Sequence, residues 1–138
     1  MKLTFLGTGS GRTSLTRGHT SLLFTNKNSS VLIDCGEGTS KTLLTSDIPL
    51  NEIDTIIISH FHADHIAGLP GLLTQYKLSG RAGALNILVP VPLKELLVTM
   101  LNSFFLFAES FRFPLNISEY DSGVATEITE ELLMTAAK

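Results

Sequence analysis

Three of the four histidines lie within six residues, in the segment from His60 to His65. Imidazole nitrogens together with a carboxylate are ligands that suit a catalytic zinc ion, with manganese or iron as alternatives. In extended chain, side chains two residues apart point the same way, so His60 and His62 can bind one ion. A turn after Ala63 would aim Asp64 and His65 at a second ion about 3.5–4 Å from the first, as in two-metal hydrolases.

Asp34 is a further carboxylate that could belong to the same site. It ends the apolar segment 30–34, and a carboxylate there can accept the outer N–H of a metal-binding histidine and so fix its tautomer. The alternative role is to cap the helix that follows. The neighbouring Cys35 is interpreted as a buried small apolar residue rather than a nucleophile, and the isolated His19 as structural or exposed.

The loop from Gly7 to Gly11 contains three glycines in five residues, but it is not a dinucleotide-binding fingerprint. Position 12, where the third required glycine would fall, is Arg12, and the next predicted element is a strand instead of a helix. Two interpretations remain open for this loop. It is either a tight turn beside the metal site or a stretch of backbone that approaches a phosphate, since only glycine allows so close an approach.

The elements that must position these residues alternate between strands and helices. The β-branched segment 55–59 is typical of a buried strand, and it leads directly into His60. Apolar residues with helical spacing from Leu69 to Tyr76 predict a helix that Gly80 ends. Further strands are predicted at 2–6, 21–25, 30–34, 86–89, 115–120, 124–128 and 132–136, and further helices at 37–46 and 93–104. The pattern predicts an α/β (α+β) fold, a mixed sheet with flanking helices.

The composition sets bounds on the class of protein. With 138 residues, 43% of them hydrophobic and 17% charged, the chain suits one globular domain. Ten Lys and Arg against 13 Asp and Glu give a net charge of −3, so a nucleic acid could be held only by a locally built site. A single cysteine and the lack of a signal-peptide pattern favour the reducing cytoplasm, and no segment is long enough to span a membrane.

Together, four segments resemble the metallo-β-lactamase fold hydrolases, and within them the ribonuclease Z family of tRNA 3′-processing endonucleases. The matching segments are FLGTGSG at 5–11, LIDCGEG at 32–38, HFHADH at 60–65 and GLPGLL at 68–73. This resemblance implies that the chain is the N-terminal half of an αβ/βα sandwich. It also implies an endoribonuclease that cleaves precursor tRNA at its 3′ end with a zinc-activated water.

The resemblance also assigns roles to individual residues. His60 and His62 would bind one zinc ion, and Asp64 and His65 the other, with Asp64 helping to orient or deprotonate the attacking water. Asp34 matches the family's carboxylate behind the metal site. The family's later ligands, two further histidines and an aspartate, cannot all be present, because no histidine follows His65. Residues 1–138 are therefore expected to be a single incomplete domain that binds metal weakly and hydrolyses little alone.

Two other functions remain open beside the tRNA endonuclease. One is another hydrolase of the superfamily, acting on a small phosphodiester, an ester or a lactone; the other is an inactive truncated fragment. The mean hydropathy of +0.28 is high for so small a chain and predicts an apolar surface that meets a partner, with a homodimer as the expected state. Five phenylalanines are expected to face that partner: Phe104, Phe105, Phe107, Phe111 and Phe113.

Overall fold

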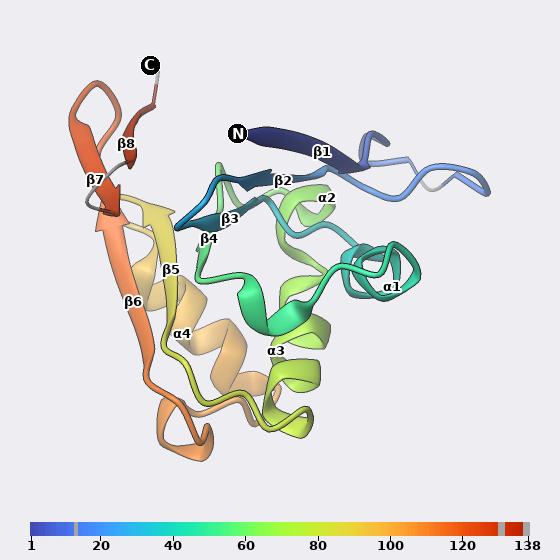
Figure 1. Ribbon diagram of the computed structural model, residues 1–138. Helices are drawn as coiled ribbons and strands as arrows, with labels where there is room; N and C mark the ends of the chain where they lie inside the picture. Colours follow the sequence, from blue (N-terminus) through green and yellow to red (C-terminus); the bar gives the residue numbers. More distant parts are fainter. Residues whose placement is uncertain (13, 130–131, 137–138) are drawn as a thin grey trace.

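Six strands form one mixed sheet in the computed structural model of the chain, which describes residues 1–12, 14–129 and 132–136 (Figure 1). The strands lie in sequence order: β1 (Lys2–Gly7), β2 (Ser21–Thr25), β3 (Ser30–Ile33), β4 (Thr55–Ile57), β5 (Leu85–Pro90) and β6 (Leu115–Tyr120). The first three strands pair antiparallel, and β3 to β6 pair parallel. The parallel strands therefore bring their carboxyl ends to one edge, where the histidine segment begins.

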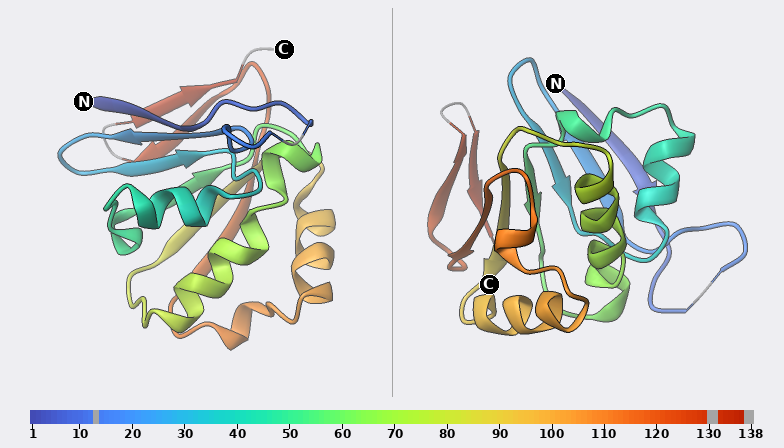
Figure 2. Two further views of the ribbon diagram at one scale, coloured as in Figure 1. Left: turned by 90° about the vertical axis from the view of Figure 1, so that its right-hand side faces the viewer. Right: turned by 90° about the horizontal axis from the view of Figure 1, so that it is seen from below.

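Helices connect the parallel strands and cover one face of the sheet, whereas a hairpin covers part of the other (Figure 2). The helices are α1 (Thr39–Thr45), α2 (Ala63–Ile66), α3 (Leu69–Leu78) and α4 (Lys94–Ser103), with 3-10 turns η1 (Leu50–Glu52) and η2 (Ala108–Ser110). The hairpin consists of β7 (Ala125–Thr129) and β8 (Leu132–Thr135), which pair antiparallel. This arrangement confirms the predicted mixed sheet with flanking helices.

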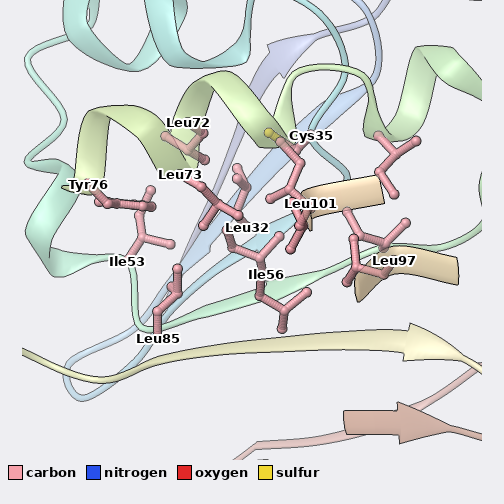
Figure 3. Packing of buried hydrophobic residues seen from close by; sticks show 14 of the residues in the cluster. Leu32, Cys35, Ile53, Ile56, Leu72, Leu73, Tyr76, Leu85, Leu97 and Leu101 are labelled. Atoms are coloured by element: carbon pink, nitrogen blue, oxygen red, sulfur yellow. The ribbon is translucent and has the colours of Figure 1, made fainter. Parts of the chain in front are cut away.

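The main core lies between the sheet and α3. Leu72, Leu73 and Tyr76 of α3 are fully buried against Leu32 and Ile56 of the central strands (Figure 3). Burying one such aliphatic side chain contributes about 1.5–3 kcal/mol. The core therefore fixes the ends of β3 and β4, from which Asp34 and the histidine segment extend.

The predicted strands and helices are all present, although several are shorter than expected. The strand predicted at 55–59 ends at Ile57, which leaves Ser59 and His60 outside the sheet. The helix predicted at 37–46 spans Thr39–Thr45, and the first helical turn after Pro92 begins at Lys94.

Leu97 and Leu101 form the buried face of α4, whereas Leu96 and Phe104 are 53% and 59% exposed. The segment after α4 requires a correction, because two of the five phenylalanines that were expected to face a partner are buried within the chain. Their exposed fractions are 8% for Phe111 and 4% for Phe113, and the Phe113 ring packs edge-on against Tyr76 at a centroid distance of 6.5 Å.

The opposite face of the sheet is apolar and only partly covered. Val31, Ile57, Leu88 and Tyr120 are buried there against the hairpin. At the β1 end of the sheet, large apolar side chains remain accessible, with Phe5 65% exposed. None of the helices in the described part of the chain has the length and apolar character that crossing a bilayer requires.

Candidate metal centre

The histidine segment spans the change from extended chain to helix that follows β4. His62 has extended backbone angles, φ −70° and ψ 145°, and it immediately precedes α2. His60 and His62 therefore come from extended chain, and Asp64 and His65 from the single helical turn of α2. The bend that was expected after Ala63 begins one residue earlier, between His62 and Ala63, and it separates the four candidate ligands into two pairs.

The first pair, His60 and His62, has the spacing of two ligands on one ion. The distance from His60 Nε2 to His62 Nδ1 is 3.1 Å, and the two rings lie edge to face with centroids 4.6 Å apart. Two nitrogens that each lie 2.0–2.1 Å from a tetrahedral zinc ion are about 3.3 Å from each other. The donor atoms of this pair therefore fit a zinc ion with little movement.

The second pair, Asp64 and His65, has a similar spacing. The distance from His65 Nε2 to Asp64 Oδ2 is 3.6 Å, close to the separation of about 3.3–3.6 Å between two ligands of one zinc ion. The His60 and His65 ring centroids are only 4.0 Å apart, so the two pairs are neighbours. The chain thus places two ligand pairs side by side, as a two-metal site requires.

Asp34 lies behind this site and contacts the histidine segment directly. Its side chain is 5% exposed, and its Oδ2 lies 2.6 Å from His65 Nδ1. Ser59 donates to the same carboxylate twice, from its backbone N–H to Oδ1 at 2.7 Å and from its hydroxyl to Oδ2 at 2.8 Å. The capping alternative does not hold, because α1 follows Gly38 without a side-chain cap.

The backbone of Asp34 has a conformation that few residues adopt. Its φ of 59° lies in the left-handed region, which aspartate tolerates better than most side chains. Two contacts hold this conformation: the Asp34 N–H donates to the carbonyl of Ile57 at 2.8 Å, and the Ser21 hydroxyl donates to the carbonyl of Asp34 at 3.0 Å. Strain of this kind is concentrated at functional sites, and here it turns the carboxylate towards His65.

Glycines allow the backbone segments around the site to cross closely. A side chain at Gly36 would collide with the carbonyl of Asp64, and one at Gly68 would collide with the carbonyl of Gly36. In the glycine loop, the position of a Cβ on Gly11 would lie 3.7 Å from the Asp64 carboxylate. The loop therefore borders the candidate metal centre, which favours its interpretation as a turn beside that site.

Cys35 takes no part in the site chemistry. It is fully buried next to Asp34, and burial raises the pKa of its thiol to about 12. A thiol that stays protonated at neutral pH is neither a nucleophile nor a ready metal ligand. The backbone of Cys35 nevertheless supports the site, because its N–H donates to the carbonyl of His65 at 2.7 Å.

Among the described residues, no three His, Cys, Asp or Glu side chains converge on one point where they could hold an ion. Each candidate ion therefore has two ligands from this part of the chain, whereas a catalytic zinc ion normally has three protein ligands and one open position. The chemistry of the donor set fits zinc. Two ligands for each ion are fewer than a complete catalytic zinc site has, so this donor set fits one part of a larger site.

Two residues of this neighbourhood had no assigned role in the sequence. Ser59 contacts Asp34 as described. In the sequence, only its position next to His60 could have indicated a role at the site. Tyr120 lies at the end of β6, where its hydroxyl contacts the carbonyls of Ile58 at 3.1 Å and Ser59 at 3.3 Å. Tyr120 is 61 residues from Ser59 in sequence, so only the parallel pairing of the strands brings the two together.

Comparison with known proteins gives one matching family model and several curated relatives. A family model described as anti-Pycsar protein Apyc1 matches residues 1–105. Ribonuclease Z of Prochlorococcus marinus (strain MIT 9312) is 42% identical over 124 residues, which is 88% of this chain and 39% of that protein. Ribonuclease Z of Bacillus velezensis is 38% identical over 99% of this chain and 44% of its own length. The chain thus spans about two fifths of the length of the curated relatives it matches.

Solved structures agree with the fold described above. The short form of human tRNase Z superposes with a TM-score of 0.73 at 33% identity, over 88% of this chain and 46% of that one. The metallo-β-lactamase fold protein YhfI from Bacillus subtilis has a TM-score of 0.73 at 21% identity, over 91% and 48% of the two chains. Zn²⁺-bound PqqB from Methylobacterium extorquens has a TM-score of 0.72 at 13% identity, over 96% and 50%.

Proposed function

Because this chain belongs to the family described as anti-Pycsar protein Apyc1 and has the metallo-β-lactamase fold, we propose that it is part of a metal-dependent phosphodiesterase. The observation that carries the proposal is the pair of two-ligand sets, at His60 with His62 and at Asp64 with His65, whose donor atoms are 3.1 Å and 3.6 Å apart. The substrate class that we propose is precursor tRNA, cleaved at its 3′ end. The identity of 36–46% to ribonuclease Z proteins supports this substrate.

The proposed cofactor is a pair of zinc ions, with manganese or iron as alternatives. When bound, such ions polarise a phosphoryl oxygen and activate a water molecule for attack. The residues of this chain hold the ligand atoms in place: Asp34 accepts the Nδ1 proton of His65, which leaves the Nε2 lone pair of that ring facing Asp64. Asp64 is the proposed group that orients the attacking water and accepts its proton.

A small phosphodiester is the second candidate substrate. The family model that matches residues 1–105 describes anti-Pycsar protein Apyc1, whereas the curated relatives are ribonuclease Z proteins, so the comparisons name two kinds of protein. The residues of the histidine segment suit both substrates, because both reactions break a phosphodiester bond.

The remaining parts of the proposal concern assembly and location. Residues 1–138 are proposed to form part of one metallo-β-lactamase-like domain that acts in the cytoplasm as a homodimer. The exposed apolar side chains at the β1 end of the sheet and after α4 support association with further protein surface, with Phe5 65% and Phe105 76% exposed.

The test measures cleavage of two substrates by the whole gene product loaded with zinc. We expect removal of the 3′ trailer from a precursor tRNA, and we expect His62→Ala to abolish it. The matched control is Thr99→Ala on the exposed side of α4, which should retain the activity. Cleavage of bis(p-nitrophenyl) phosphate without cleavage of the tRNA would favour the second candidate. Cleavage of neither substrate would overturn the proposal.

A further inference from the structure

We propose that Ser59 is a positioning residue that links His60 to the buried Asp34 carboxylate. Through this link, one carboxylate would set the ring tautomer of a histidine in each of the two ligand pairs. The inference rests on the proposed metal centre for its purpose, although its geometry stands without a bound ion. Asp34 contacts His65 directly, and Ser59 is the only described residue that contacts both Asp34 and His60 through its side chain.

Two short distances define the link. The Ser59 hydroxyl oxygen lies 2.8 Å from Asp34 Oδ2 and 3.0 Å from His60 Nδ1. The same hydroxyl is 3.4 Å from His65 Nδ1, but that nitrogen lies closer to Asp34, at 2.6 Å, and bonds to it instead. Ser59 thus bridges Asp34 and His60, whereas His65 bonds to Asp34 without a bridge.

The protons can be assigned only one way if Asp34 is a carboxylate. A carboxylate accepts hydrogen bonds and donates none, so the single hydroxyl proton of Ser59 goes to Asp34 Oδ2. The Ser59 oxygen is then free to accept, and its partner His60 Nδ1 must carry a proton. The other nitrogen of that ring, Nε2, consequently presents a lone pair, and it lies 3.1 Å from His62 Nδ1.

The backbone of Ser59 is held by two contacts of its own and by one of its neighbour Ile58. Its backbone N–H donates to Asp34 Oδ1 at 2.7 Å, and its carbonyl lies 3.3 Å from the Tyr120 hydroxyl. The residue before it is tied to the sheet, because the Ile58 N–H donates to the carbonyl of Leu88 at 2.9 Å. A hydroxyl on a fixed backbone can hold an imidazole ring in one orientation, which is what a ligand needs before its ion arrives.

The first test reads the tautomer of His60 in the metal-free protein by two-bond ¹H–¹⁵N correlation spectroscopy. At about pH 8, above the ordinary titration range of imidazole, we expect His60 to be protonated on Nδ1 in the native sequence. Ser59→Thr keeps the hydroxyl and should keep this tautomer, whereas Ser59→Ala should give a mixture of both. An Nε2-protonated His60 in the native sequence would overturn the proposal without any variant.

Ser21→Ala is the matched control for the loss of a serine hydroxyl. Ser21 donates to the backbone carbonyl of Asp34 at 3.0 Å, so this change removes a buried hydrogen bond at the same residue without touching the carboxylate. We expect His60 to keep its Nδ1 proton in this variant. A mixture of tautomers in Ser21→Ala as well as Ser59→Ala would mean that general loosening of the site, not the Ser59 link, controls the ring.

The second test measures zinc affinity by competition with a chromophoric chelator. Loss of a hydrogen-bond partner behind a metal ligand typically lowers affinity about 10–100-fold, and we expect Ser59→Ala to show a loss in this range and Ser59→Thr to recover most of it. Equal affinity of Ser59→Ala and the native sequence would contradict the proposal. Failure of the proposed phosphodiesterase activity is a separate outcome, because the tautomer is read with no metal and no substrate.

Discussion

At the scale of single residues, the Asp34 carboxylate contacts the candidate site through both of its oxygens. It meets His65 at 2.6 Å and receives two hydrogen bonds from Ser59. An acceptor with both oxygens occupied cannot be replaced by an amide without placing N–H groups against other N–H or O–H donors. The site therefore depends on the charge and the two acceptor oxygens of this residue, as well as on its shape.

Asp34→Asn tests this dependence. We expect zinc affinity to fall about 10–100-fold, because the amide would turn a donor towards His65 or Ser59 and disturb ring orientation. Asp47→Asn is the control, since Asp47 is an exposed aspartate that also has a left-handed backbone, with φ 51°. Chelator competition measures both variants, and an unchanged affinity of Asp34→Asn would show that the carboxylate is not needed.

Cys35 makes the stability of the chain depend on pH in the alkaline range. Burial raises the pKa of its thiol from 9.0 to about 12 in the folded protein. Above about pH 9 the unfolded chain loses this proton while the folded chain keeps it, so the free energy of unfolding falls as pH rises, by up to about 1.4 kcal/mol per pH unit. The contribution is fully present below pH 9.

Urea unfolding at a series of pH values measures this effect, and Cys35→Ala isolates it. Burial also raises the pKa of Tyr76, which adds a fall in the same direction. The informative comparison is therefore between two slopes of the free energy of unfolding against pH, one for the native sequence and one for Cys35→Ala. We expect the slope of Cys35→Ala to be flatter between about pH 9 and pH 11. Parallel slopes for the two proteins would show that Cys35 does not titrate as its burial requires.

At the scale of elements, a close backbone crossing holds the segment after the histidines against the segment that follows β3. Gly68 precedes α3, and a side chain there would meet the carbonyl of Gly36. The Gly68 N–H also donates to the carbonyl of Cys35 at 2.9 Å, so the two segments are bonded as well as packed. This crossing sets the distance between Asp34 and the helical turn that carries Asp64 and His65.

Gly68→Ala should therefore destabilise the chain. Its φ of −80° suits alanine, so the cost comes from the collision with backbone, and overpacking of this kind typically costs about 1–3 kcal/mol. Gly71→Ala is the control, because Gly71 lies within α3 and has nothing within 4 Å of its added Cβ. We expect that control to stabilise α3 by about 0.5–1 kcal/mol. Urea unfolding at neutral pH compares the two variants. Equal stabilities would show that the close approach of Gly68 to the Gly36 carbonyl does not require glycine.

Local patterns in the sequence predicted the strands and helices, because each strand or helix has a characteristic spacing of apolar residues within its own segment. The hairpin of β2 and β3 and the buried strand β4 follow from alternation and β-branching in adjacent residues. The buried face of α4 was not predicted, since apolar residues on more than one side of this helix fit a helical spacing and only tertiary packing chooses between them. Leu97 and Leu101 face the sheet, and Phe104 does not.

The candidate site was predictable where its ligands are close in sequence and not where they are distant. His60 to His65 form one continuous signal, whereas Asp34 had two open roles until the sheet placed it 2.6 Å from His65. The contact of Tyr120 with Ser59 spans 61 residues and depends on the order of three parallel strands. No local pattern carries that information.

At the scale of the whole molecule, the chain leaves apolar surface uncovered on one face of its sheet. The hairpin covers Val31, Ile57 and Leu88, but Leu3 and Phe5 at the β1 end are 51% and 65% exposed. Contiguous apolar surface of this kind is typical of an interface with further protein. The high mean hydropathy of +0.28 therefore reflects surface as well as core.

The ligand count and the coverage of the relatives lead to one expectation for the 138-residue chain by itself. The described residues give two ligands to each candidate ion, and the chain spans 39–44% of the curated relatives' length in the two comparisons given above. Two ligands hold zinc more weakly than three, because each further bond adds affinity without a new entropic cost of capture. Two ligands also do not fix which coordination position of the ion stays open for a substrate.

We therefore expect this chain to retain well under one zinc ion per molecule after dialysis, and to turn over a phosphodiester hardly at all. Elemental analysis and an assay with bis(p-nitrophenyl) phosphate measure the two quantities. Sedimentation velocity on the same sample is the control, because a self-associated form could supply ligands across an interface. Stoichiometric zinc together with turnover, in a monomer, would show that the four candidate ligands between His60 and His65 suffice and that the site needs no further ligand.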